Sequence, residues 1–189
     1  MLVLASASPR RRELLRWLVA EYDLDVAKVD ESARPGEAAA ALVGRLAEAK
    51  AGAVAGRRPE AWVLGADTVV EIDGDVLGKP ADPREAAGML RRLSGREHRV
   101  VTGFTLLAPH GRARHGGTVE SRVLFHDLSP RTIEAYVATG EPLDKAGSYA
   151  IQGRGAGLVA RVDGSFTNVI GLPLGEVGAA LREAGLLAR

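Results

Sequence analysis

Cysteine is absent from this chain of 189 residues, which excludes thiol catalysis, zinc–cysteine sites and redox switching. Long hydrophobic runs are also absent: no segment reaches the length of a membrane span, and the first apolar stretch meets arginine at position 10, which argues against a signal peptide. The formal net charge is only +1, which argues against general coating of nucleic acid. These absences predict a cytoplasmic protein with neither a membrane nor a nucleic-acid partner.

Lysine is rare in this sequence: four lysines, at positions 28, 50, 79 and 145, stand beside 21 arginines. Because a compact ammonium and a planar guanidinium bind anions differently, the rarity of lysine is a weak pointer to function at these positions. The four histidines, at positions 98, 110, 115 and 126, lack the spacing of a zinc site. We expect structural or solvent-exposed roles for the histidines.

Short apolar strands alternate with helical patterns, which predicts an α/β fold with a cleft, formed by one domain over residues 1–189. Strands are predicted at 2–5, 23–26, 62–72, 76–77, 98–108, 118–127 and 158–162. Helices are predicted at 11–18, 37–55, 83–93, 130–139 and after Pro173. The connections 30–36, 109–117 and 140–157 are predicted to be loops.

The segment from Ser6 to Arg12 joins a predicted strand to a predicted helix. Backbone N–H groups and the helix dipole favour an anion at such a place. Arg10 and Arg11 add forked donors and Ser8 adds a hydroxyl, so a triphosphate would fit this loop. The alternative is a solvated basic first turn of the helix.

Two acidic residues are candidate metal ligands or general bases. Asp67 lies near the middle of an apolar strand, where an unpaired charge is costly to bury, and Glu31 lies in an exposed loop. Magnesium suits carboxylate and phosphate oxygens, so both residues could hold the metal, or one could hold it while the other activates water. The alternatives are a turn residue for Asp67 and an ordinary surface glutamate for Glu31.

Three further residues are candidates because of where they lie. Lys50 lies near the end of the long predicted helix, and Lys79 lies in the turn Gly78-Lys79-Pro80. Gln152 lies in the glycine-rich stretch 147–157 and offers an amide donor and acceptor to a base edge. The alternatives are a solvated turn for Lys79 and an ordinary glycine loop around Gln152. The residues alone support phosphate binding together with carboxylates.

Taken together, these segments resemble the Maf family of nucleotide pyrophosphatases. The matching elements follow the family's order over nearly the whole chain, and their combination is specific although each alone is weak. They are Leu4-Ala5-Ser6-Ala7-Ser8-Pro9-Arg10-Arg11, Asp30-Glu31, Arg45-Leu46-Ala47 with Lys50-Ala51, Gly65-Ala66-Asp67-Thr68, Gly78-Lys79-Pro80, Met89-Leu90 with Leu93-Ser94-Gly95, Thr102-Gly103, Asp144-Lys145-Ala146-Gly147 and Gly171-Leu172-Pro173-Leu174.

The resemblance implies an elongated mixed sheet flanked by helices, in two lobes around a central cleft, related to the inosine triphosphate pyrophosphatase architecture and commonly dimeric. It implies attack of water on the α-phosphorus of a nucleoside triphosphate, with a divalent cation, magnesium or manganese, as cofactor. Asp67 matches the position of the proton acceptor. The positions around the triphosphate and the metal are matched by Ser8, Arg11, Glu31, Lys50 and Lys79.

The resemblance also extends to the substrate. The branch of the family that acts on dTTP and UTP resembles this chain in having Arg10, Thr68 and Gln152. The branch that acts on 7-methyl-GTP has a bulky aromatic residue, a Gln and a Glu there, and a carboxylate suits a cationic methylated guanine whereas a neutral amide suits uracil or thymine. We therefore expect hydrolysis of dTTP, UTP or modified pyrimidine nucleotides, a house-cleaning role in nucleotide pools. The alternatives are 7-methyl-GTP hydrolysis and a non-catalytic role in regulating septum formation.

Overall fold

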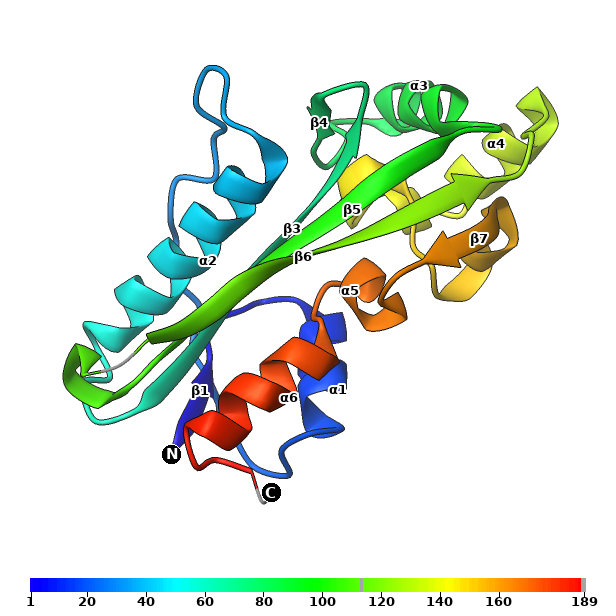
Figure 1. Cartoon of the computed structure of the whole chain (residues 1–189). Helices are drawn as coiled ribbons and strands as arrows, with labels where there is room; N and C mark the ends of the chain where they lie inside the picture. Colours follow the sequence, from blue (N-terminus) through cyan, green and yellow to red (C-terminus); the bar gives the residue numbers. More distant parts are fainter. Residues whose placement is uncertain (113, 188–189) are drawn as a thin grey trace. The chain divides into compact units, whose positions relative to one another are not determined.

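The structure is a computed structural model that describes residues 1–112 and 114–187. Seven strands form one mixed sheet in the order β2-β1-β3-β5-β6-β7, with β4 paired to β3, and helices flank the strands (Figure 1). The prediction of an α/β fold is therefore confirmed. The chain groups into two compact units: unit 1 comprises Met1–Asp67, Thr102–Val119 and Gly171–Arg189, and unit 2 comprises Thr68–Val101 and Glu120–Ile170. The residues of the three long strands β3, β5 and β6 are shared between the units, and these strands span Trp62–Ile72, Glu97–Leu107 and Arg114–Phe125.

Unit 1 is built around a parallel arrangement of short strands. The strand β1 pairs in parallel with β2 on one side and with β3 on the other. The helix α2 covers one face of these strands, and α1 and α6 lie on the other (Figure 1). The elements that belong wholly to unit 1 are β1 (Leu2–Leu4), α1 (Pro9–Arg16), β2 (Asp23–Leu24), α2 (Ala39–Ala55), the 3-10 turn η1 (Pro109–Gly111) and α6 (Leu174–Glu183).

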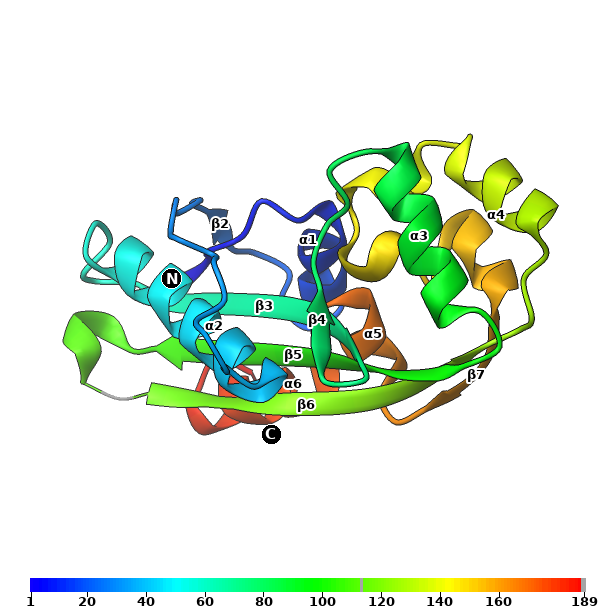
Figure 2. The ribbon, with the colours of Figure 1, turned by 90° about the horizontal axis from the view of Figure 1, so that it is seen from above.

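Unit 2 joins antiparallel strand pairs to a pair of helices. The strand β4 pairs antiparallel with β3, and β7 pairs antiparallel with β6. The helices α3 and α4 lie side by side in both views of the ribbon (Figures 1 and 2). The elements that belong wholly to unit 2 are β4 (Asp75–Leu77), α3 (Pro83–Leu93), α4 (Pro130–Val137), the 3-10 turns η2 (Glu141–Asp144), η3 (Ala146–Ser148) and η4 (Gly153–Leu158), β7 (Val159–Asp163) and α5 (Phe166–Ile170).

Each unit has a hydrophobic core of its own. Small residues dominate the core between α2, β1 and β3 in unit 1, which consists of Val3, Ala5, Ala51, Val54, Ala61 and Val63. Large aliphatic and aromatic side chains dominate the core of unit 2, among them Leu90, Leu93, Phe125, Tyr136 and Tyr149. Burial of this apolar surface is the main force that stabilises each unit.

Three helices begin with the same local chemistry, a polar cap followed by proline. Ser8, Asp82 and Ser129 each accept a hydrogen bond from the backbone N–H three residues later, and proline follows each cap. The cap satisfies one of the exposed N–H groups of the first turn, and proline at that place has no N–H to satisfy. These signals are local in sequence, which is why the starts of these helices could be predicted.

The predicted loop 109–117 is wrong in part, because β6 begins at Arg114. Three glycines made this segment look like a loop, yet a Cβ on Gly116 would lie only 2.6 Å from the carbonyl oxygen of Phe104 in β5. The glycine there allows close approach of two strand backbones rather than a turn. The short helix α5 was not predicted; it lies between β7 and Gly171.

The histidines are structural or exposed, as predicted. His98 is buried, and its Nε2 lies 2.8 Å from the hydroxyl of Tyr149. Burial lowers the pKa of His98 to about 4, so this ring is neutral near pH 7. His115 lies in β6, where it contacts Glu183 and the ring of Trp62.

Glycine lets α2 approach the sheet closely. A Cβ on Gly65 in β3 would collide with the carbonyl oxygen of Ala47 and lie 2.8 Å from the backbone nitrogen of Ala51. A Cβ on Gly103 in β5 would lie 2.5 Å from the carbonyl of Val43. Backbone therefore contacts backbone at two points between α2 and the strands, and neither point can accept a side chain without movement of the helix.

Replacing Gly65 by alanine should test this close approach. We expect Gly65→Ala to lower the free energy of unfolding by about 1–3 kcal/mol, because the added methyl group meets backbone that cannot move aside. Gly52→Ala is the matched control, since a Cβ at Gly52 in α2 meets nothing within 4 Å and should stabilise the helix by about 0.5–1 kcal/mol. Urea unfolding measures both changes; equal stability of the two variants would contradict the proposed contact.

Candidate functional site

The loop between β1 and α1 is shaped by its serines and by Arg11. The side-chain oxygen of Ser6, a buried residue, accepts hydrogen bonds from the backbone nitrogen of Ser8 at 3.2 Å and from Nη1 of Arg11 at 3.4 Å. Nε of Arg11 donates to the carbonyl oxygen of Gly171 at 2.8 Å. The loop is therefore fixed at both ends, and Arg11 links it to the segment that precedes α6.

The start of α1 has a strongly positive environment. Arg10, Arg11 and Arg12 lie in its first turn, which contains no acidic residue. Burial, and to a smaller extent the positive charge of Arg10, lower the pKa of Arg11. The negative charges of Asp67 and Glu31 act in the opposite direction but do not outweigh burial. A helix N-terminus already favours negative charge, so an anion bound here would offset both the dipole and the arginines.

Lys50 binds two carboxylates at once. Its Nζ lies 2.6 Å from Oδ1 of Asp67 and 2.7 Å from Oε1 of Glu31. The side chains of Lys50 and Asp67 are each 11% exposed, whereas that of Glu31 is 58% exposed. A buried ammonium or carboxylate is tolerated only when it is paired, and here one positive charge faces two negative charges. The cluster therefore has a net negative charge that a cation can neutralise.

The fold brings Lys50 to Asp67 through the glycine contact described above. Side chains alternate along a strand, so Gly65 and Asp67 face the same side of β3, the side on which α2 lies. On α2, Ala47, Lys50 and Ala51 share a face because they are three and four residues apart. The absence of a side chain at Gly65 brings α2 close enough for Lys50 to reach the next inward position of the strand.

The loop that carries Glu31 is held by an arginine of α2. Nε and Nη2 of Arg45 each donate to one carboxylate oxygen of Glu37 at 2.7 Å, and Nη2 also donates to the carbonyl of Ser32 at 3.0 Å. The backbone nitrogen of Arg34 donates to the same carboxylate at 3.0 Å. The hydrogen bonds from Arg45 contribute most, followed by the one from Arg34, and together they lower the pKa of Glu37 to about 2. The backbone beside Glu31 is therefore ordered although the loop is exposed.

Six of the predicted site residues lie in unit 1, where the structure brings five of them together. Glu31, Lys50 and Asp67 are in direct contact, Ser8 caps α1 through the backbone nitrogen of Arg11, and the charges of Asp67 and Glu31 act on Arg11. The sixth, Arg10, lies half-buried in the same turn of α1. The first turn of α1 and the cluster of Glu31, Lys50 and Asp67 are therefore near enough for their charges to interact.

The other three predicted site residues belong to unit 2. Thr68 follows Asp67 directly, so its side chain faces the opposite side of β3. Lys79 is exposed in a turn whose Gly78 carbonyl accepts a hydrogen bond from the backbone nitrogen of Gly147 at 3.0 Å. Gln152 is half-buried just before η4. The contact of Lys79 with the triphosphate and the roles of Thr68 and Gln152 in selecting the substrate stay predictions.

Some contributors to this site were not predicted from the sequence. Ser6, Arg45 and Gly171 lie in segments that carried the resemblance, but no role had been assigned to them, and Glu37 was not singled out at all. The available signal for this pair was a glutamate, Glu37, just before α2, followed by an arginine, Arg45, about two turns along the helix. The carbonyl of Gly171 could not be found from sequence, because every residue has one.

Glu31 and Asp67 were predicted to hold a divalent cation, and the structure allows their donor atoms to be compared with that role. Both carboxylates converge on one ammonium, which shows that their oxygens can share a small positive partner. Within residues 1–112 and 114–187 there is no group of three or more histidine, aspartate or glutamate side chains arranged for a metal. Two carboxylates completed by phosphate oxygens and water suit magnesium, so the donors fit a cation that binds together with a phosphorylated ligand.

Comparison with known proteins gives consistent matches over almost the whole chain. The family model described as Maf-like protein matches residues 1–184. A protein of Myxococcus xanthus named dTTP/UTP pyrophosphatase is 55% identical over 186 residues, covering 98% of this chain and 93% of its own length. Proteins of the same name from Geobacter metallireducens and Syntrophus aciditrophicus are 50% and 49% identical, and 97% and 91% of their lengths are covered, respectively, with 98% of this chain covered in each case.

Among solved structures, the Staphylococcus aureus Ham1 protein matches with a TM-score of 0.46 at 15% sequence identity, over 67% of this chain and 72% of that chain. Among the residues that the structure describes, no helix is long and apolar enough to cross a membrane.

Removing the ammonium from the carboxylate pair should destabilise the fold. We expect Lys50→Met to lower the free energy of unfolding by about 3–5 kcal/mol at pH 7, because it leaves Asp67 as a buried, unpaired charge. Asp67→Asn added to Lys50→Met should recover part of that loss, since it removes the unpaired charge. Urea unfolding of the two single variants and the double variant measures the coupling.

Lys28→Met is the control for this cycle, because Lys28 is exposed in the same unit and its replacement should change stability by no more than about 0.5 kcal/mol. Strictly additive effects of Lys50→Met and Asp67→Asn would rule out the direct interaction.

Proposed function

The chain belongs to the Maf family, and from this premise we propose that it hydrolyses dTTP and UTP to the nucleoside monophosphate and pyrophosphate. Relatives with this named activity share about half of its residues over almost their full length. The observation that carries the proposal is the Lys50 ammonium held between Glu31 and Asp67, beside the arginine-lined start of α1. Such a site combines anion binding with carboxylates able to handle a proton or a cation.

In the proposed reaction, water attacks the α-phosphorus and the bond from this phosphorus to the oxygen that bridges to the β-phosphate breaks. Asp67 accepts the proton of the attacking water, and pyrophosphate leaves with the electron pair of the broken bond. Lys50 fixes the orientation of the Asp67 carboxylate through their contact of 2.6 Å. A base that is already held in place needs no reorganisation during the reaction.

The positive side chains of this site would bind the triphosphate. Arg11 is fixed by Ser6 and Gly171, so its guanidinium is pre-oriented, and Ser8 lies in the same turn. Lys79 is proposed to contact the phosphates from its exposed turn. These groups offset the negative charge that spreads over phosphate oxygens in the transition state.

Glu31 and Asp67 are proposed to hold a magnesium or manganese ion. When bound, such an ion neutralises phosphate charge and aligns the triphosphate for displacement. The net negative charge of the cluster formed by Glu31, Lys50 and Asp67 supports this assignment.

The pyrimidine base is proposed to be selected by Gln152 with Arg10 and Thr68. A neutral amide offers one donor and one acceptor, which complements the imide edge of uracil or thymine. A site built around such hydrogen bonds rejects bases that leave its polar groups unpaired.

We further propose that the protein acts in the cytoplasm as a homodimer. The cytoplasmic location is supported by the nucleotide pools that would supply dTTP and UTP. The homodimer is supported by the family resemblance. Light scattering of the purified chain gives the mass that checks the dimer, and a monomer at micromolar concentration would contradict it.

An assay of pyrophosphate release with dTTP, UTP, CTP, GTP and 7-methyl-GTP tests the proposed activity. We expect dTTP and UTP to be hydrolysed fastest in the presence of magnesium or manganese, with loss of activity after chelation. Asp67→Asn should lower kcat by about 10²–10⁴-fold, because an amide cannot accept the proton.

Asp163→Asn serves as the matched control, since Asp163 is exposed at the end of β7 and should not affect activity. Normal hydrolysis by Asp67→Asn would refute the assignment of the base. Faster hydrolysis of 7-methyl-GTP than of dTTP would refute the substrate branch, and no release from any triphosphate would favour a non-catalytic role.

A further inference from the structure

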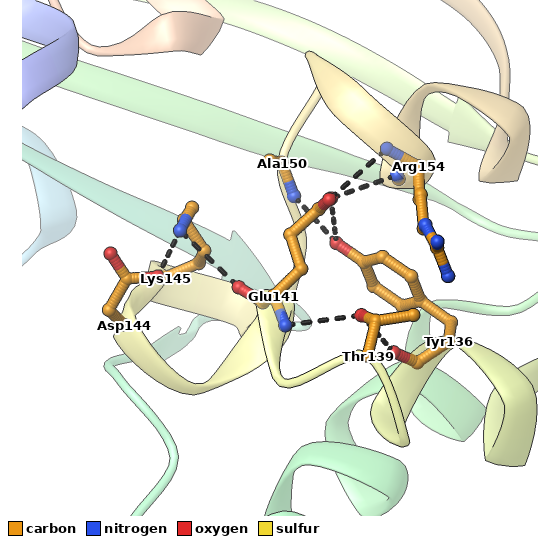
Figure 3. Close-up of polar contacts among 8 residues, drawn as sticks. Tyr136, Thr139, Glu141, Asp144, Lys145, Ala150 and Arg154 are labelled. Atoms are coloured by element: carbon orange, nitrogen blue, oxygen red, sulfur yellow. Dashed lines mark hydrogen bonds and ion pairs between the residues drawn. The ribbon is translucent and has the colours of Figure 1, made fainter.

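The glycine-rich segment that carries Gln152 is held by one carboxylate. Oε2 of Glu141 accepts a hydrogen bond from the backbone nitrogen of Arg154 at 3.1 Å. Oε1 of Glu141 accepts one from the backbone nitrogen of Gly155 at 3.0 Å and one from the hydroxyl of Tyr136 at 2.8 Å. Figure 3 shows these donors gathered around the Glu141 carboxylate.

The same network also holds the chain on the other side of Gln152. The backbone nitrogen of Ala150 donates to the hydroxyl of Tyr136 at 3.1 Å, while this hydroxyl donates to Glu141 (Figure 3). The backbone is therefore fixed two residues before Gln152 and again two and three residues after it. Hydrogen bonds on both sides of Gln152 restrict the movement of this segment.

Two glycines let the segment around Gln152 lie directly against Glu141 and Tyr136. Gly153 has a φ of +74°, and a Cβ there would lie 2.8 Å from Oε2 of Glu141. A Cβ on Gly155 would lie 2.6 Å from the hydroxyl oxygen of Tyr136. The path of the backbone past Gln152 is thus set by contact with Glu141 and Tyr136.

Glu141 is itself held in place and ionised. Its backbone nitrogen donates to Oγ1 of Thr139 at 3.1 Å, and its carbonyl accepts from Nζ of Lys145 at 3.3 Å (Figure 3). Partial burial alone would raise the pKa of Glu141, but the hydrogen bonds from Gly155, Tyr136 and Arg154 outweigh it and lower the pKa below its ordinary value. The carboxylate therefore accepts all three hydrogen bonds at neutral pH.

We propose that Glu141 and Tyr136 are positioning residues that set the preference for a pyrimidine base by fixing the segment around Gln152. This inference rests on the proposed function, in which Gln152 contacts the base. An amide discriminates between bases only when its donor and acceptor are held to within a fraction of an ångström, because a loose amide can turn or shift to suit another base. The Glu141 network supplies that restraint without touching the substrate.

The experiment compares wild type with Glu141→Gln and Tyr136→Phe. In Glu141→Gln, the amide NH2 faces one of the backbone N–H donors, and in Tyr136→Phe the link between Ala150 and Glu141 is lost. For each variant we expect KM for UTP to rise about tenfold while kcat changes by less than about threefold, and the ratio of kcat/KM for UTP to that for GTP to fall about tenfold. Gln152→Ala should change the same ratio in the same direction.

A readout besides activity is hydrogen exchange of the backbone amides. The amides of Arg154 and Gly155 should exchange faster in Glu141→Gln than in wild type, because they lose a charged acceptor. Ser129→Ala is the matched control: it removes the cap of α4, the helix that carries Tyr136, and should lower stability by about 1 kcal/mol while leaving the substrate ratio unchanged.

The outcomes separate this inference from the proposed function. If wild type releases no pyrophosphate from UTP, both the function and the inference are wrong. If wild type prefers UTP and both variants keep its substrate ratio and KM within twofold, the inference alone is wrong. A change of the ratio in Ser129→Ala equal to that in Glu141→Gln would show a general effect of lowered stability and would also overturn it. Tyr136→Phe decides the matter if Glu141→Gln does not fold.

Discussion

The ion cluster in which Lys50 contacts both Asp67 and Glu31 is the interaction on which the candidate site depends. A carboxylate in the middle of an apolar strand would be prohibitively costly without a partner, so the fold must deliver an ammonium to it. The helix α2 does so only because Gly65 lets its backbone touch β3. The same helix holds the Glu31 loop through the contact between Arg45 and Glu37. The helix α2 therefore positions both the Lys50 ammonium and the Glu31 carboxylate that contacts it.

The arginine-rich start of α1 and the Glu31–Lys50–Asp67 cluster are complementary in charge. Three arginines at a helix N-terminus repel one another and oppose the dipole, and the carboxylates of the cluster partly compensate for this in the absence of ligand. Arg11 also donates hydrogen bonds to Ser6 and Gly171, which limits the freedom of its side chain before any ligand binds. Less ordering is then required on binding, and more of the interaction energy remains available for the reaction.

In unit 2 a carboxylate also holds a candidate segment in place, but its partners are of a different kind. The carboxylate of Glu141 is satisfied by backbone donors and a phenol rather than by a lysine, and it fixes a glycine-rich segment rather than a charged side chain. In both units, glycines occur where backbone or a polar group must come within a distance that a Cβ would prevent. These glycines are structural requirements of packing and not only of turns.

The sequence by itself determined the local features of this protein. The caps Ser8, Asp82 and Ser129 with their prolines set the starts of three helices, and apolar periodicity placed most strands, because both depend on neighbours in the chain. The ordered motifs identified the family and the candidate residues. Only the tertiary structure decided that Arg114 to Gly117 form a strand and that Lys50 reaches Asp67. It also decided that Glu37, Gly171 and Glu141 hold the segments that carry the candidate residues. Except for the pair Glu37 and Arg45, those contacts join residues far apart in sequence. They are set by how closely helices and loops pack on the strands, which no local pattern encodes.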